Sequence, residues 1–211
     1  MFRMIIFDLD GTVLNTLDDI HSSMMDTLDK FGFDKFSIDV TKTYVGDGIS
    51  KLVERAVTSE RYTKKIEDYF RFVYNKRLVE TTKPYEGITD VLERLKTEGV
   101  CQVVLSNKAT EYTDSIVRHF GLDKYLDGWY GFDCFHEKKP SPLPVREILK
   151  VKHFSADESI MIGDNYTDIE SGAGAGIKTC FCKYGYGKLR SVQADYFIDS
   201  PSEILQIAGI K

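Results

Sequence analysis

Residues 7–16 read F-D-L-D-G-T-V-L-N-T and directly follow the apolar run Met4-Ile5-Ile6. Such a run is typical of a buried strand, and side chains two positions apart on a strand point to the same face. Asp8 and Asp10 are therefore expected to lie close together where the strand ends. Two carboxylates at that distance repel each other unless a positive charge lies between them. The stretch predicts a site for a cation or a charged ligand at the end of a strand.

The chain has the size and composition of a soluble globular protein. It has 211 residues, of which 42% are hydrophobic and 29% charged, and its formal net charge is -5. This charge does not indicate a nucleic-acid partner, and no stretch approaches the ~20 apolar residues of a membrane span. The apolar N-terminal run is too short for a signal peptide. We therefore expect a cytoplasmic protein, without nucleic-acid or membrane partners, that keeps its thiols reduced at Cys101, Cys134, Cys180 and Cys182.

Short apolar runs alternate with helical patterns along most of the chain. This alternation predicts an α/β fold, a Rossmann-like parallel sheet with helices on both faces. The expected strands are 4–7, 101–105, 159–162, 178–182 and, more weakly, 196–198. The expected helices between them are 88–98, 110–120 and 144–151.

The segment 15–82 interrupts the alternation. It holds no convincing strand and several helical patterns, at 17–31, 49–57 and 62–79. Because one helix is enough to connect two parallel strands, this much helix predicts an inserted all-helical cap domain. The core would then consist of residues 1–14 and 83–211. We expect the cap to swing about connections at 14–17 and 82–87.

Four short polar signals come at or near the carboxyl ends of the expected strands, where ligands of open α/β sheets bind. The acids Asp8, Asp10, Asp164 and Asp168 offer hard oxygen ligands, which suit Mg²⁺ better than Zn²⁺. Anion-binding groups accompany them: Ser106 and Asn107 at an expected helix start, and Lys139. Taken singly, a Ser-Asn pair is typical of a helix cap and a Lys-Pro pair of a surface turn. Together they predict a magnesium ion and a phosphoryl group between the aspartates.

In these four signals the sequence resembles the haloacid dehalogenase superfamily, and in particular its phosphatases. Asp8-Leu9-Asp10-Gly11-Thr12 matches the first motif, Ser106 the second, Lys139 the third, and Gly163-Asp164 with Asp168 the fourth. The resemblance covers nearly the whole chain, and residues 15–82 match the helical cap of the family's first cap class.

The resemblance implies a two-step phosphoryl transfer. Asp8 would attack phosphorus to form an aspartyl-phosphate, and Asp10 would serve as acid and then as base. Mg²⁺ would be held by Asp8, the backbone carbonyl of Asp10 and Asp164, with Asp168 supporting it through water. The residues expected at the phosphoryl group are Ser106, Asn107, Lys139 and Thr12, of which Thr12 would also help to fix Asp10.

Within the superfamily, phosphoglycolate phosphatases match best. They commonly show V-G-x-G-x-x-x-L-V-x-R-A in the cap, and residues 45–56 read V-G-D-G-I-S-K-L-V-E-R-A. Gly46 and Gly48 would let a cap loop approach the active site, although a simple turn is also compatible with them. Lys51 and Arg55 are candidates to bind a substrate carboxylate. The expected partner is a small phosphorylated metabolite, with 2-phosphoglycolate favoured.

Alternatives stay open at this point. The same machinery serves pyrophosphatases and sugar-phosphate phosphatases, and a catalytically silent phospho-ligand-binding module is conceivable. A β-phosphoglucomutase is less favoured, because Ile20 stands where such enzymes have a cap histidine. Asn15 and Leu143 stand where relatives usually have aspartate, which leaves the bracing of Lys139 in question. Monomer and homodimer are both compatible with the sequence.

Overall fold

The computed structural model describes residues 1–210. Its centre is a six-stranded sheet in which all paired neighbours are parallel, with the order β5-β4-β1-β6-β7-β8. The strands are β1 (Met4–Phe7), β4 (Cys101–Leu105), β5 (Gly128–Tyr130), β6 (Ser159–Gly163), β7 (Lys178–Cys182) and β8 (Tyr196–Ile198). The predicted Rossmann-like class is therefore confirmed. All five predicted strands form, whereas β5, a short edge strand with two glycine-flanked aromatics, was not predicted.

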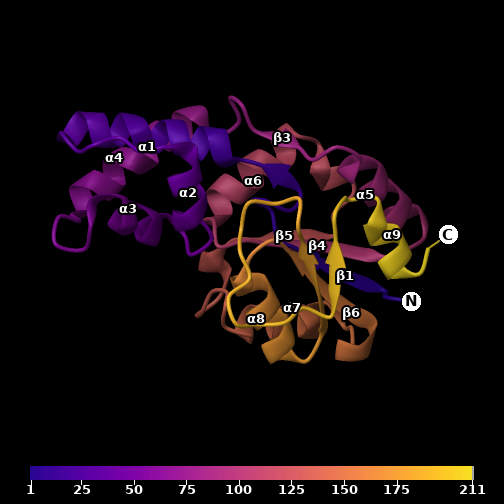
Figure 1. Ribbon diagram of the computed structural model, residues 1–211. Coiled ribbons are helices and arrows are strands. Elements are labelled where there is room, and N and C mark those ends of the chain that lie inside the picture. Colours follow the sequence, from indigo (N-terminus) through magenta and orange to yellow (C-terminus); the bar gives the residue numbers. More distant parts are fainter. Residues whose placement is uncertain (211) are drawn as a thin grey trace.

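Helices cover both faces of this sheet (Figure 1). Ile5 and Phe7 of β1 pack into the larger apolar cluster, while Met4 and Ile6 pack into a second cluster with Ile148 and its neighbours. This alternation explains why β1 is apolar at every position: a central parallel strand is buried on both sides. The core helices are α5 (Ile88–Thr97), α6 (Thr110–His119), α7 (Leu143–Lys152), α8 (Tyr166–Ala175) and α9 (Glu203–Ala208).

Four helices between β1 and β4 lie together at one end of the molecule, to the left in Figure 1. They are α1 (Leu17–Phe31), α2 (Ile38–Tyr44), α3 (Ile49–Val57) and α4 (Lys64–Arg77), of which α2 was not predicted. We call residues 15–82 the cap segment; its boundaries stay a prediction. The two boundaries lie at a small antiparallel pair of strands that the sequence did not indicate, β2 (Leu14–Asn15) with β3 (Lys83–Pro84).

A buried carboxylate fixes the two chain connections to each other. Asp19, near the start of α1, accepts hydrogen bonds from the backbone N–H and the hydroxyl of both Thr81 and Thr82, at 2.6–3.1 Å. Such a set of donors compensates for burying the charge.

The short 3₁₀ helices are Leu122–Lys124, Phe132–Cys134 and Ala156–Glu158. Among residues 1–210, no helix has the length and apolar character needed to cross a bilayer.

Candidate active site

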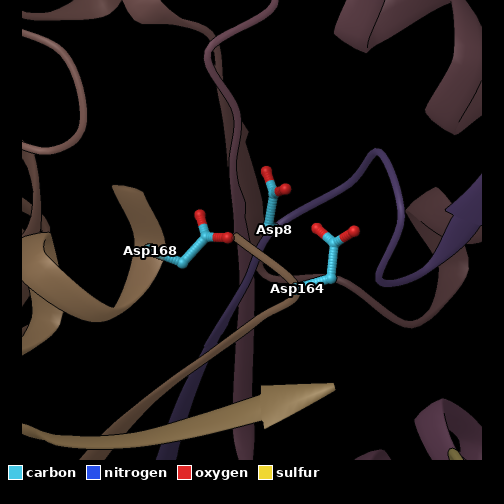
Figure 2. A group of neighbouring side chains, drawn as sticks. All are labelled: Asp8, Asp164 and Asp168. Carbon is cyan, nitrogen blue, oxygen red and sulfur yellow. The ribbon is translucent and has the colours of Figure 1, made fainter. Parts of the chain in front are cut away.

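Three buried carboxylates converge at the carboxyl edge of the sheet. Asp8 follows β1, Asp164 follows β6, and Asp168 lies in the first turn of α8 (Figure 2). One oxygen of each lies within 4.8 Å of the others. Since β1 and β6 are adjacent and parallel, their ends necessarily meet, which brings residues 156 positions apart in sequence together.

Local structure fixes the orientation of two of these acids. Asn165 caps α8 by accepting from the N–H of Thr167, and Asp168 accepts in return from the N–H of Asn165 at 3.0 Å, which is a capping box. Gly11 has φ +86°, and a Cβ there would lie 2.1 Å from Oδ2 of Asp164. Glycine is therefore required at position 11 both by its backbone conformation and by the close approach of Asp164.

Lys139 is a buried cation between two of the carboxylates. Its Nζ lies 2.7 Å from Oδ1 of Asp8, 2.6 Å from Oδ1 of Asp168 and 2.6 Å from the carbonyl of Leu105. These three acceptors use all three of its N–H donors. Burial alone lowers the pKa of Lys139, but the two carboxylates outweigh it and raise that pKa, so the ammonium stays charged. Asp168 and the Leu105 carbonyl thus hold Lys139 in place. Leu143 has no carboxylate with which to do so. It is the first residue of α7, and no side chain caps that helix.

The acids still carry more negative charge than Lys139 offsets. Burial and the repulsion of neighbouring aspartates raise the pKa values of Asp8 and Asp164 above their ordinary range. Within residues 1–210, no protein donor is bonded to Oδ2 of Asp8 or to Oδ1 of Asp164. Free carboxylate oxygens in a buried, electron-rich cluster fit a hard divalent cation such as Mg²⁺.

Asp10 lies beside this cluster and is held from one side. Its Oδ1 accepts from Oγ1 of Thr16 at 2.6 Å and from Nζ of Lys108 at 2.9 Å. Thr16 therefore fixes Asp10, and the predicted role of Thr12 in this was wrong. The turn at Gly11 carries Thr12 away from the cavity: its Oγ1 is buried without a partner among residues 1–210.

Ser106 and Asn107 follow β4, but α6 begins only at Thr110, so they do not lie at a helix start as expected. Ser106 Oγ accepts from the N–H of Lys108 at 3.1 Å, which leaves its own hydroxyl proton to donate. The two N–H donors of the Asn107 amide are already used: Nδ2 donates to the carbonyls of Gly46 and Lys139 at 2.9 and 3.0 Å. Asn107 thus joins the cap segment to the core.

These groups border a cavity of about 70 Å³ between the core and the cap segment. A single water needs roughly 10–15 Å³, so there is room for a small molecule of a few heavy atoms. The floor is polar and includes Asp8, Asp10, Ser106, Lys108, Lys139 and Asp164. The wall from the cap segment is largely apolar and consists of Ile20, Val45, Gly46, Gly48, Ile49, Leu52, Phe70 and Tyr74.

Gly46 and Gly48 lie at this cavity, as expected of a cap loop that approaches the site. Gly46 has φ +109°, and a Cβ there would lie 2.5 Å from the side chain of Asn165. Lys51 and Arg55 do not border the cavity. Lys51 pairs with Glu54 on the surface, and Arg55 is bonded to Asp47 and to the Tyr44 carbonyl. Lys51 and Arg55 lie on a face of α3 that points away from the cavity, because Leu52 and Val53 occupy the buried face of this helix.

Two residues at the cavity were given no role from the sequence. They are Lys108, directly after Asn107, and Tyr74 on α4. Their side chains meet through a hydrogen bond of 2.5 Å between Nζ and the phenol oxygen. A lysine directly after a strand-end motif was the available signal for Lys108; nothing local distinguished Tyr74.

Asn15 stands at the expected connection between the core and the cap segment. Its side-chain oxygen accepts a hydrogen bond from the N–H of Leu17 at 3.3 Å.

Comparison with known proteins places this geometry in a family. Residues 5–182 match the family model of haloacid dehalogenase-like hydrolases. A phosphoglycolate phosphatase of Aquifex aeolicus is 36% identical over 97% of this chain and 96% of its own length. One from Neisseria gonorrhoeae is 32% identical over 92% and 85%. The crystal structure of a predicted phosphoglycolate phosphatase from Haemophilus somnus superposes with a TM-score of 0.91, at 28% identity, covering 98% of this chain and 97% of that one. The resemblance seen in the four motifs is confirmed: the chain belongs to the haloacid dehalogenase-like hydrolases.

Proposed function

We propose that this hydrolase is a magnesium-dependent phosphatase that removes the phosphoryl group of a small phosphorylated acid, 2-phosphoglycolate, through an aspartyl-phosphate. The observation that carries the proposal is the Asp8–Lys139 pair at the floor of a small cavity, in which Lys139 is also paired with the buried Asp168. The names of the relatives from Aquifex aeolicus and Neisseria gonorrhoeae support the substrate.

Asp8 would be the nucleophile. One of its carboxylate oxygens would form a bond to phosphorus while the bond from phosphorus to the ester oxygen breaks. Lys139 would favour the ionised form of Asp8 against the effect of burial, because its ammonium is bonded to Oδ1 of Asp8 at 2.7 Å. The Ser106 hydroxyl would donate to a phosphoryl oxygen.

Asp10 would move the proton. Thr16 and Lys108 both donate to Oδ1, so the proton would be carried on Oδ2. Asp10 would give this proton to the departing alkoxide and later accept one from the water that hydrolyses the aspartyl-phosphate. Mg²⁺, held by Asp8, Asp164 and the carbonyl of Asp10, would supply positive charge against the phosphoryl oxygens.

The test is phosphate release from 2-phosphoglycolate, glucose 1-phosphate and pyrophosphate, with and without Mg²⁺. We expect magnesium-dependent release with a clear preference for 2-phosphoglycolate. In the Asp8→Asn variant release should fall to background, whereas Asp133→Asn, in the 3₁₀ helix Phe132–Cys134 and outside the cavity lining, should behave as wild type. Persistent turnover by a pure Asp8→Asn preparation would overturn the nucleophile assignment, and a preference for pyrophosphate or the sugar phosphate would overturn the substrate.

The mutase alternative gains no support from the cavity. Ile20 borders it, and His21 is directed elsewhere, with Nδ1 2.8 Å from Oγ1 of Thr41. A mostly apolar wall is also a poor match for the several hydroxyls of a sugar.

A further inference from the structure

We propose that Lys108 and Tyr74 form the site that binds the carboxylate of the substrate's leaving group, and so select a phosphorylated acid over a neutral phosphate ester. This inference rests on the proposed phosphatase activity and adds residues to which neither the motifs nor the relatives assign a role. It replaces Lys51 and Arg55 as the candidates for that task.

Charge is the first argument. Within the part of the chain that the structure describes, the cavity is bordered by two cations, Lys139 and Lys108. All three donors of Lys139 are engaged by Asp8, Asp168 and the Leu105 carbonyl. A carboxylate that is buried in this cavity must find a charged or hydrogen-bonding partner, because burying it unpaired is very costly. Lys108 is the remaining cation.

Lys108 also has a donor to spare. Among residues 1–210 its ammonium makes two hydrogen bonds, to Asp10 at 2.9 Å and to the Tyr74 hydroxyl at 2.5 Å, and an ammonium has three N–H donors. The side chain is only 6% exposed, so bulk water does not readily satisfy the third donor.

Position is the second argument. In 2-phosphoglycolate the carboxyl carbon is bonded directly to the carbon that carries the ester oxygen. The group that binds the carboxylate must therefore lie next to the group that protonates the ester oxygen. Lys108 meets this requirement, because it is bonded to Asp10 itself. A longer acid would bring its carboxylate against the apolar wall instead.

Tyr74 adds a contribution from the cap segment. Its ring is stacked on Phe70, and the residue is 1% exposed, so the hydroxyl is held at the cavity by packing. Burial raises the pKa of Tyr74 to about 12, so the phenol stays protonated and can donate to an anion. Because Tyr74 belongs to α4 and Lys108 to the core, a carboxylate bound by both would also favour the closed position of the cap segment.

The test compares kcat/KM for 2-phosphoglycolate and for ethyl phosphate, which has the same skeleton with a methyl group in place of the carboxylate. In Lys108→Met the ratio of the two should fall about 10- to 100-fold, the range expected for one lost charged hydrogen bond. The loss should appear mainly in KM for 2-phosphoglycolate. Tyr74→Phe should lower the ratio several-fold, and Lys108→Arg should recover part of it. Lys76→Met, which removes an exposed cation two residues from Tyr74, should leave the ratio unchanged.

The outcomes separate the two proposals. A wild-type enzyme that hydrolyses neither ester, or both equally well, contradicts the proposed function or its substrate class. A wild-type preference for 2-phosphoglycolate that survives in Lys108→Met overturns the present inference alone. If Lys108→Met abolishes turnover of both esters because Lys108 also holds Asp10, kcat/KM no longer tests the inference. Binding of the two esters is then measured by calorimetry in an Asp8→Asn background. There, adding Lys108→Met must weaken 2-phosphoglycolate binding at least tenfold more than ethyl phosphate binding; equal weakening overturns the inference.

Discussion

The ammonium of Lys139 lies 2.6 Å from the carboxylate of Asp168, and the two side chains are 1% and 0% exposed. Removing one partner of so buried a pair leaves the other charge unpaired, so Lys139→Met should destabilise the fold by about 3–5 kcal/mol. Urea unfolding without added metal measures this. The neighbouring Lys138→Met is the control, since that ammonium contacts a backbone carbonyl of the cap loop, and it should stay within about 1 kcal/mol of wild type. Equal losses in the two variants would mean that the buried pair has no special part in stability.

Gly46 is expected to allow the close approach of the cap loop to the core. Gly46→Ala would place a Cβ 2.5 Å from the Asn165 side chain, whereas a Cβ at Gly32, also in the cap segment, meets nothing within 4 Å. Both positions have positive φ, so both variants should lose about 1 kcal/mol of stability. Only Gly46→Ala should also lower kcat/KM, by about tenfold. A similar loss of activity in Gly32→Ala would show that backbone strain, and not cap approach, is responsible.

Asp47 and Tyr166 connect the cap loop to the core, with 2.5 Å between Oδ1 and the phenol oxygen. Burial and Asp47 raise the pKa of Tyr166 to about 12, so the phenol remains a donor at neutral pH. A double-mutant cycle of Asp47→Ala and Tyr166→Phe should give a coupling free energy of about 1–2 kcal/mol in urea unfolding. The exposed Asp39–Lys42 pair in the same segment should give less than about 0.5 kcal/mol. A coupling no larger than that of the exposed pair would argue against a cap–core contact in solution.

Glu67 should make the stability of the protein depend on pH. Burial alone would raise its pKa, but hydrogen bonds from Tyr62, Arg71 and Lys64 outweigh burial and lower it to about 2. Since the folded-state pKa lies below the ordinary value of 4.5, this stabilisation is present above pH 4.5 and is lost as the pH falls toward 2.

Glu67→Gln should therefore lower the free energy of unfolding by roughly 1–3 kcal/mol at pH 7 and by less at pH 3, measured by urea unfolding at both values. Asp68→Asn, next in sequence, is exposed and among residues 1–210 is paired with Lys64 alone, so it should have little effect at either pH. A loss for Glu67→Gln that is the same at both pH values would contradict the assignment.

The sequence by itself determined the sheet and the group of acids at its edge. The five predicted strands are apolar runs, and three of them, β1, β4 and β6, carry motifs at their carboxyl ends. Parallel neighbours bring such ends together whatever the rest of the chain does. Asp8, Asp164 and Asp168 could be predicted to meet for that reason. The boundaries of α1 and α3 were also readable, because amphipathic periodicity is a local property.

Only the tertiary structure decided which side chains face the cavity. Lys108 meets Asp10 across 98 residues and Tyr74 across 34, and Asn107 meets Gly46 across 61. Such contacts depend on how the cap segment packs on the core and on the conformation of the loop after Gly11. Neither of these produces a periodic pattern of residues in the sequence. The same docking directs Lys51 and Arg55 outward and puts Thr16, not Thr12, beside Asp10. Side-chain direction on a surface helix or in a tight loop is set by what packs against it, and that is a property of the assembled fold.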